Sequence, residues 1–138
     1  MRRHLVEPIF SWMEKVGLSV VFWKVLHLTE NDLSTLYSYC RKAVHYPNLR
    51  KFLISGHVVF YVVFSENGDA IEALNRLVGS TDPKTALRET IRGRYGTSIA
   101  RNVIHSTQNE TTLRVDLKHF LSKEEMLNLF LLNRNISS

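Results

Sequence analysis

The sequence predicts an α+β protein in which several helices cover a small sheet. Two runs rich in β-branched and aromatic residues, 18–28 and 57–64, are separated by stretches where apolar residues recur at helical spacing. Strands separated by helices in this way favour a layered sandwich. The length of 138 residues and the apolar content of 44% suit one domain with a substantial core. We therefore expect a single domain over residues 1–138.

The first half of the chain is expected to contain the strand at 18–28 and three helices. Apolar residues at helical spacing predict a helix over 4–16. Thr29 together with Asp32 is typical of a helix N-terminus, because each side chain can cap a backbone amide of the other. The second helix is expected to run from there to Cys40, and Pro47 opens a third, short helix.

The second half begins with HVVFYVVF at 57–64, and such an unbroken apolar run is typical of a strand covered on both faces. Residues 80–98 show no apolar period and include a proline and two glycines, so we expect a long ordered loop of the functional kind. Val103 and Ile104 predict a third, short strand. The other elements expected here are helices at 71–78, at 112–121 and after a capping box of Ser122 and Glu125.

The composition narrows the partners and the compartment. The formal net charge of +5 favours anionic ligands such as nucleotides. The basic residues are scattered rather than gathered in one block, so nucleic-acid binding is not indicated. No run approaches the roughly 20 apolar residues of a membrane span, so no membrane association is expected, nor is a signal peptide. Since Cys40 is the only cysteine, an internal disulfide is impossible and the reducing cytoplasm is the expected location.

The stretch from Thr90 to His105 contains the residue types that phosphoryl transfer needs. A neutral, oriented histidine can act as a nucleophile, and cations must surround the phosphate that moves. His105 follows an apolar pair, Arg92 can bind phosphate through two N–H groups, and Asn102 can bond a sugar hydroxyl. Asp116 on the following helix can orient the imidazole. Such a histidine is more often packed or solvated than catalytic, and such arginines more often lie on the surface, so both interpretations stay open on this pattern.

Three longer motifs make the pattern more specific. They are TIRGRYGTSIARNVIH at 90–105, LVGSTDP at 77–83 and SGHVV at 55–59. They resemble G-T-I-R-G-D-F followed by R-N-x-I-H, L-M-G-x-T-N-P and S-G-P-V-V, which are motifs of the nucleoside diphosphate kinase family. The resemblance extends over nearly the whole chain and is most specific from residue 77 to residue 105.

The resemblance implies a ferredoxin-like βαββαβ sandwich and a ping-pong reaction. The γ-phosphate of ATP or another nucleoside triphosphate would pass to His105 and then to a nucleoside diphosphate, with Mg²⁺ bound through the nucleotide phosphates. Asp116 would orient the histidine and Tyr37 would pack beside it. The residues implied in nucleotide binding are Arg92, Thr81 and Asn102 for phosphate and sugar, His45 with its neighbour Tyr46 and Ile99 for the base, and Arg76.

The chain departs from the family in ways that bear on activity. The family begins with an interior strand that carries a phosphate-binding lysine, and we expect this first strand to be missing, because Met1 falls just after that point. Its neighbours would then expose unpaired edges. The arginine that the family places four residues before Gly79 is Asn75, with Arg76 one position further on.

Two hypotheses of different class follow. The first is a nucleoside diphosphate kinase that uses His105, because the loop around this residue matches the family well. The second is a degenerate nucleotide-binding or interaction protein of the same fold with little or no turnover, because the first strand and its lysine are missing. In either case the resemblance implies a homo-oligomer, in which the region of Phe22 and Trp23 would contribute to a dimer.

Overall fold

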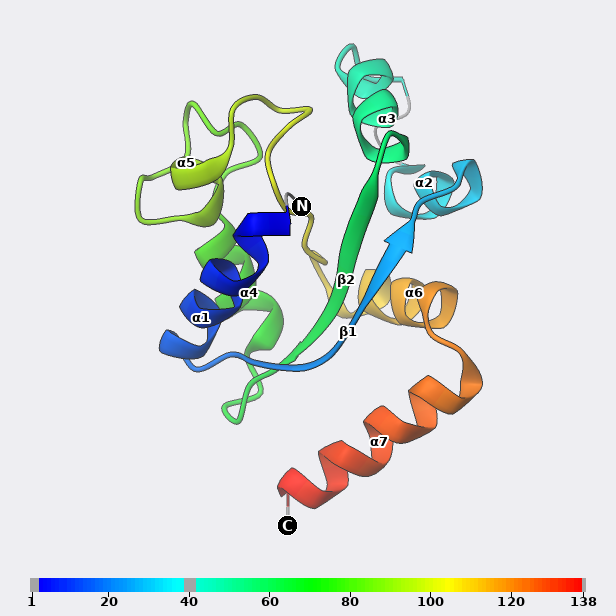
Figure 1. The fold of residues 1–138 in the computed structure, drawn as a ribbon. Helices are drawn as coiled ribbons and strands as arrows, with labels where there is room; N and C mark the ends of the chain where they lie inside the picture. The colour runs from blue at the N-terminus through cyan, green and yellow to red at the C-terminus, as the bar shows by residue number, and fades with distance from the viewer. Residues whose placement is uncertain (1–2, 39–41, 138) are drawn as a thin grey trace.

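The computed structural model describes residues 3–38 and 42–137, so the expectation that the second helix reaches Cys40 falls outside the described residues. Two strands lie among the helices along the chain (Figure 1). The elements are η1 (Arg3–Leu5), α1 (Val6–Lys15), β1 (Ser19–His27), α2 (Glu30–Leu36), α3 (Tyr46–Ile54), β2 (His57–Phe64), α4 (Ala70–Val78), α5 (Ile91–Tyr95), α6 (Glu110–Phe120) and α7 (Lys123–Ser137).

Most of the expected elements are confirmed within a few residues. The cap of α2 forms as predicted, since the amide of Asp32 donates to Thr29 Oγ1 at 3.2 Å and the amide of Thr29 donates to Asp32 Oδ2 at 2.8 Å. The box that opens α7 also forms, with Ser122 and Glu125 bonding each other's amides. The predicted loop at 80–98 is wrong in one respect, because it contains the short helix α5.

The sheet in the described part of the chain consists of β1 and β2 alone, paired antiparallel from Ser19 opposite Phe64 to His27 opposite His57. A register shift between Val20 and Phe22 marks a bulge in β1. The extra residue turns Val20 to the face opposite that of Phe22, although the two lie two positions apart.

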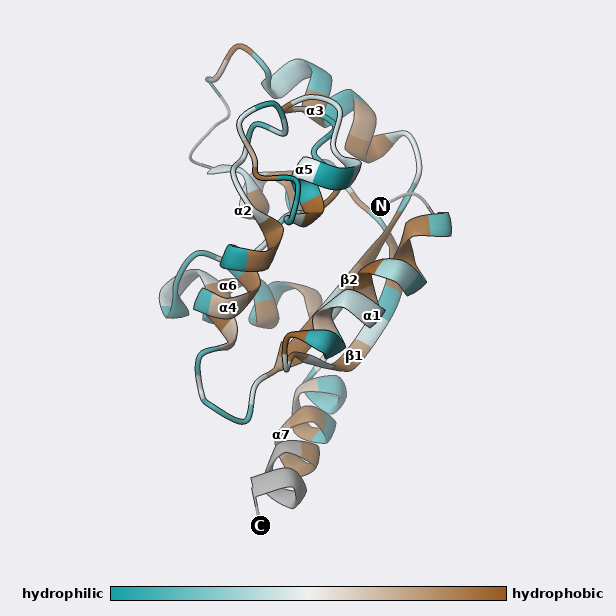
Figure 2. Ribbon diagram, turned by 90° about the vertical axis from the view of Figure 1, so that its left-hand side faces the viewer, coloured by the Kyte–Doolittle hydropathy of each residue, from teal (hydrophilic) through white to brown (hydrophobic). Residues whose placement is uncertain are grey.

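The two faces of this ribbon pack against two separate apolar clusters. Tyr61 and Val63 of β2 contact the first cluster, and Val58 and Phe60 contact the second. Figure 2 shows the apolar residues along both strands and on the helix faces that cover them. The buried members of the first cluster are Leu5, Ile9, Met13, Leu18, Leu74, Leu77, Val78, Ile91 and Ile104; those of the second are Leu28, Leu33, Tyr37, Tyr46, Leu49 and Phe120.

The expectation that 57–64 is covered on both faces is thus confirmed, yet nearly all of its side chains stay half-buried. The reason is an apolar groove of about 210 Å³ that follows β2, lined by every residue from 58 to 63. Within the described ranges β2 has a ladder partner on one edge only. A ribbon of two strands leaves the outer edge of each strand without a ladder partner.

The predicted third strand at Val103 and Ile104 is wrong. Val103 has φ of +79°, in the left-handed region, and the amide of Ile104 donates to the carbonyl of Asn102 at 3.0 Å. This is a γ-turn centred on a β-branched residue, a strained and rare conformation. Apolar, β-branched composition favoured a strand here, but the fold bends the chain at this point, directly before His105.

The C-terminal helix α7 leaves the body of the molecule at an angle (Figure 1). Over the residues whose burial is described, most of its apolar side chains are exposed, among them Leu127 and Phe130. None of the helices in the described ranges is long and apolar enough to span a membrane.

Candidate active site

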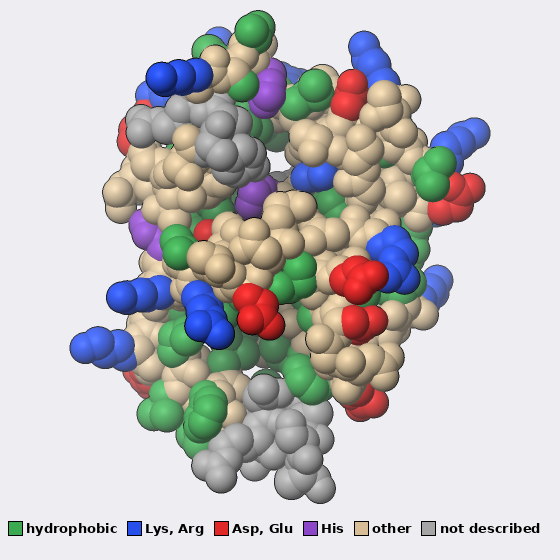
Figure 3. Space-filling view, turned by 180° about the vertical axis from the view of Figure 1, so that it is seen from behind, with side chains coloured by type: hydrophobic (Ala, Val, Ile, Leu, Met, Phe, Trp, Pro, Cys, Tyr) green, Lys and Arg blue, Asp and Glu red, His purple; other side chains and the backbone are tan. Residues whose placement is uncertain are grey.

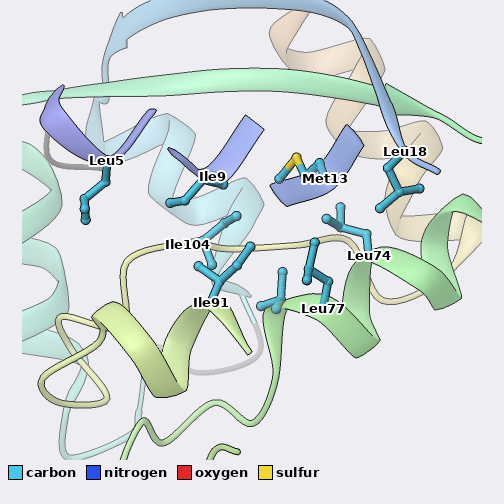
Figure 4. Packing of buried hydrophobic residues seen from close by; sticks show 9 residues of the cluster. Leu5, Ile9, Met13, Leu18, Leu74, Leu77, Ile91 and Ile104 are labelled. Atoms are coloured by element: carbon cyan, nitrogen blue, oxygen red, sulfur yellow. The ribbon is translucent and has the colours of Figure 1, made fainter. Parts of the chain in front are cut away.

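His105 lies in a segment, residues 96–109, that forms neither helix nor strand. Ile104, just before it, is 5% exposed and inserts into the first cluster opposite Ile91 of α5 (Figure 4). The γ-turn at Val103 then sets the direction in which the chain continues. An apolar anchor and a sharp turn therefore precede the histidine, which explains why it directly follows Val103 and Ile104.

Arg92 of α5 is buried, with 7% of its surface exposed, and its guanidinium holds two parts of the chain together. Its Nε and Nη2 donate to the carbonyl of Ile104 at 3.2 and 2.8 Å, and its Nη1 donates to the carbonyl of Gly79 at 3.1 Å. Gly79 ends α4 with φ of +88°, and a Cβ there would lie 2.4 Å from Thr90 Oγ1. Only glycine fits where the backbone at residue 79 approaches the side chain of Thr90 so closely. This approach lets Arg92 bridge α4 and the segment before His105.

The imidazole of His105 is kept neutral. It is half-buried and packs edge-on against the ring of Tyr37, with ring centroids 5.0 Å apart. Burial, with a smaller contribution from the positive charge of Arg92, lowers the pKa of His105 from 6.5 to about 4. At neutral pH one ring nitrogen therefore carries a lone pair, as a nucleophile needs.

This pKa predicts a measurable pH dependence. Between about pH 4 and pH 6.5 the unfolded chain binds a proton at His105 that the folded protein does not bind. Above pH 6.5 this group therefore does not lower the free energy of unfolding. As the pH falls toward 4, the free energy of unfolding decreases by on the order of 3 kcal/mol. We expect an NMR titration to give a pKa near 4 for the imidazole signal that disappears in His105→Asn. A midpoint close to 6.5 would contradict the burial of this ring.

Asp116 of α6 is buried beside the same groove but forms no hydrogen bond with His105 within the described residues. Its Oδ2 accepts from Thr107 Oγ1 at 3.4 Å, and its Oδ1 is buried without a partner in that part of the chain. Burial raises the pKa of the Asp116 carboxyl, although the bond from Thr107 opposes this effect. The structure thus brings the carboxyl and the imidazole to the same groove.

The side chain of Asn102 contacts the backbone of Thr81. Asn102 Nδ2 donates to the carbonyl of Thr81 at 3.2 Å, so that the predicted phosphate and sugar ligands lie together although 21 residues separate them. The residues of the predicted site that line the apolar groove are Tyr37, Asn102, His105 and Asp116. The view from behind shows a hollow in this face with histidine and basic side chains beside it (Figure 3).

His45 and Ile99, the expected base-binding pair, lie on two segments that contact each other. His45 precedes the first residue of α3, and Ile99 belongs to the turn at 97–101. The guanidinium of Arg101 in this turn lies over the ring of Phe52 of α3, 5.1 Å from its centroid. This cation–π contact holds the turn against α3.

Arg76 is placed differently from the other predicted ligands. Its guanidinium pairs with Glu72, one turn earlier on α4, at 2.9 Å, and the side chain is 71% exposed. Its neighbour Asn75 points instead toward the segment after His105 and bonds three of its residues. In the sequence Asn75 stands out only as the replacement of an expected arginine. Its position four residues before Gly79, about one helical turn, is the signal that it shares that helix end with the site.

The donors around His105 fit phosphate oxygens better than a metal ion. They are a guanidinium, an amide and a hydroxyl, whereas Mg²⁺ prefers carboxylate and carbonyl oxygens and water. Asp116 is the one carboxylate among the described residues that line the groove. In the described ranges no three His, Cys, Asp or Glu side chains are grouped so that they could hold a metal ion. A divalent ion at this site would therefore have to arrive with its own ligands, as it does on a nucleoside triphosphate.

Comparison with known proteins identifies the family of this chain. The family model "Nucleoside diphosphate kinase" matches residues 1–126. The nucleoside diphosphate kinase of Sulfurisphaera tokodaii is 32% identical over 127 residues, which cover 92% of this chain and 85% of that protein. The nucleoside diphosphate kinase of Sulfolobus acidocaldarius is 33% identical over 120 residues, covering 87% of this chain and 81% of that protein.

A solved structure gives the same result. The crystal structure of nucleoside diphosphate kinase from Encephalitozoon cuniculi superposes with a TM-score of 0.81 at 27% identity, over 90% of this chain and 83% of that one. The α+β, ferredoxin-like fold expected from the sequence is thereby confirmed. On the match of its family model and of its relatives, this chain belongs to the nucleoside diphosphate kinase family.

Proposed function

We propose that this protein is a nucleoside diphosphate kinase, which acts as one domain over residues 1–138 and transfers the γ-phosphate of ATP or another nucleoside triphosphate to a nucleoside diphosphate. The observation that carries the proposal is the placement of His105 in the groove, packed on Tyr37 and directly after the carbonyl that the buried guanidinium of Arg92 binds. The family match and the named relatives support the enzyme over the degenerate alternative.

The reaction would proceed in two balanced steps. The lone pair of a ring nitrogen of His105 attacks the γ-phosphorus, a P–N bond forms, and the bond from that phosphorus to the bridging oxygen breaks and releases the diphosphate. A terminal oxygen of a second diphosphate then attacks the same phosphorus, and the P–N bond breaks. Burial of the ring favours this exchange, because the neutral imidazole is the form that both steps need.

Other residues would hold the substrate and the nucleophile. Arg92 would neutralise charge on the phosphates, and Thr81 and Asn102 would bond phosphate and sugar oxygens. Asp116 would orient the imidazole, either by a rotation of its side chain or through Thr107, and Tyr37 would limit the motion of the ring. Arg76 would have to release Glu72 before it reached a phosphate.

The base would lie between His45 and Ile99. Contact with the faces of the base, without bonds to its edge, would admit different bases, since every base has a π-face. Mg²⁺, carried by the nucleotide phosphates, would add positive charge at the oxygens where negative charge develops. We also propose that the protein is located in the cytoplasm, as expected from its single cysteine.

A two-stage labelling experiment tests the activity. We expect the protein, incubated with γ-labelled ATP and Mg²⁺ and then separated from nucleotide, to carry a label that is lost in acid and stable in base. Addition of an unlabelled diphosphate such as GDP should move the label to GTP over many turnovers. A protein that binds ATP but acquires no label would instead be the degenerate nucleotide-binding form.

We also propose that the protein forms a homo-oligomer through β1. Trp23 and Val25 of this strand are 59% and 55% exposed, which is unusual for apolar residues at the middle of a strand. The resemblance places a dimer contact in the same region.

If β1 forms this contact between chains, a charged side chain on β1 should prevent association. Trp23→Glu should lower the molar mass measured by size-exclusion chromatography with light scattering to that of one chain, 16.0 kDa, because a buried unpaired carboxylate strongly disfavours association. Leu87→Glu is the matched control, since Leu87 is 70% exposed on the loop before α5. A wild-type protein that is already monomeric at tens of micromolar would contradict the assignment.

A further inference from the structure

The position of His105 depends on side-chain contacts, because its segment belongs to no helix or strand. On the N-terminal side, Arg92 binds the carbonyl of Ile104. On the C-terminal side, one side chain binds the three residues that follow the histidine. That side chain is Asn75, which lies in the last turn and a half of α4.

Both ends of the Asn75 amide are used at once. Its Oδ1 accepts from Ser106 Oγ at 2.6 Å and from Gln108 Nε2 at 3.2 Å. Its Nδ2 donates to the carbonyl of Thr107 at 2.9 Å. Gln108 Nε2 also donates to the carbonyl of Ser106 at 3.2 Å, which closes the loop on itself.

Two of these bonds, to Ser106 and Thr107, are partly buried, the bond from Gln108 is exposed, and all three span a long sequence separation. Ser106 is 5% exposed, and Asn75 is half-buried. The pairs lie 31 to 33 residues apart, so the bonds join α4 to the His105 segment rather than stabilising a local turn. Loss of one such buried partner leaves donors and acceptors that water cannot readily satisfy.

We propose that Asn75 is a positioning residue for phosphoryl transfer, which fixes the backbone of residues 106–108 and thereby the direction of the His105 imidazole. The inference rests on the proposed function, since it concerns the same nucleophile. Asn75 itself need not touch the nucleotide. Because attack must be in line with the breaking bond, a displacement of about 1 Å costs on the order of 10²-fold in rate.

The contact of Asn75 with Thr107 also links Asn75 to Asp116. Thr107 Oγ1 is the group that donates to Asp116, at 3.4 Å, so Asn75 also places the bond to the carboxyl beside the groove. Gly79, four residues after Asn75, accepts the bond from Arg92. The end of α4 therefore holds the histidine segment from both sides, once through Asn75 and once through Arg92.

The side-chain amide of Asn75 is what this role requires, because it offers both a donor and an acceptor. The resemblance places an arginine at this position, and a guanidinium has donors but no acceptor. It could not accept the bonds from Ser106 and Gln108. The polar side chains of Ser106 and Gln108 are the donors that need the acceptor of Asn75.

Single-turnover kinetics test the proposal. At saturating γ-labelled ATP, we expect Asn75→Ala to slow formation of the acid-labile label by about 10- to 100-fold, while the affinity for ADP changes by less than about threefold. Asn75→Arg should be slowed as well, because it removes the acceptor. A faster Asn75→Arg variant would show instead that the position had merely lost a phosphate-binding cation. Asn128→Ala, on the exposed surface of α7, is the matched control.

A second measurement needs no activity. In the nucleotide-free protein the imidazole of His105 should titrate near pH 4, and in Asn75→Ala its midpoint should move toward 6.5 as the segment loosens and water enters. If Asn75→Ala does not fold, Ser106→Ala removes one bond and should show the same two effects with smaller size. Unchanged titration and unchanged labelling would overturn the proposal. A wild-type protein without label would remove the kinase function but leave the titration as a valid test of positioning.

Discussion

His105→Ala is expected to abolish labelling by γ-labelled ATP and to lower phosphate exchange between nucleotides by at least about 10⁴-fold. The reason is that no other described side chain in the groove offers a neutral nitrogen lone pair, and without the covalent intermediate the two half-reactions are no longer coupled. Binding of ADP should persist, since Arg92, Thr81 and Asn102 remain. Label incorporation and steady-state exchange, measured on the same preparation, check both statements.

His4→Ala is the control for this change, because His4 is exposed on η1 and lies outside the groove. It should retain full labelling. If His105→Ala still acquired an acid-labile label, another residue would be the nucleophile and the proposed mechanism would be wrong.

Arg92→Ala is expected to have the second largest effect, and it should act on both activity and stability. Loss of a cation at the phosphates lowers kcat/KM by about 10²- to 10³-fold. The carbonyls of Gly79 and Ile104 also lose their donors, and a buried acceptor without a partner costs about 1–3 kcal/mol. We therefore expect a lower melting temperature together with the lower kcat/KM.

Arg92→Lys distinguishes the effect of the positive charge from the effect of the hydrogen bonds that the guanidinium makes. A lysine keeps the positive charge but cannot bridge Ile104 and Gly79 with a planar fork. We expect it to bind nucleotide better than Arg92→Ala while the melting temperature remains low. Arg114→Ala is the matched control, since Arg114 is 83% exposed with only a 4.0 Å contact to Glu110; it should match the wild type in both measurements. Wild-type activity in Arg92→Ala would refute a role at the phosphates.

The regular elements could be predicted because their signals are local. The run at 57–64, the Thr29–Asp32 cap and the spacing of α1 depend on near neighbours along the chain, and the structure confirms all three. The candidate nucleophile and Arg92 were found through the motif at 90–105, in which both residues stand at fixed spacing. Helix α5 was missed because five residues are too few to show an apolar period.

The remaining features of the site could not be predicted because they arise from contacts between distant segments. The γ-turn at Val103 runs against the strand preference of a β-branched residue, and the burial of Ile104 beside Ile91 accompanies it. The three bonds of Asn75 span more than 30 residues, and the low pKa of His105 requires the ring to be enclosed.

The sequence by itself determined the two strands, most of the helices and the family, and it indicated His105 as the candidate nucleophile, because apolar spacing, capping pairs and motif residues lie close together along the chain. Only the tertiary structure decided how that histidine is held: by an arginine from α5 on one side and an asparagine from α4 on the other. Burial and long-range hydrogen bonds set its charge and direction, and both depend on parts of the chain that meet only after folding.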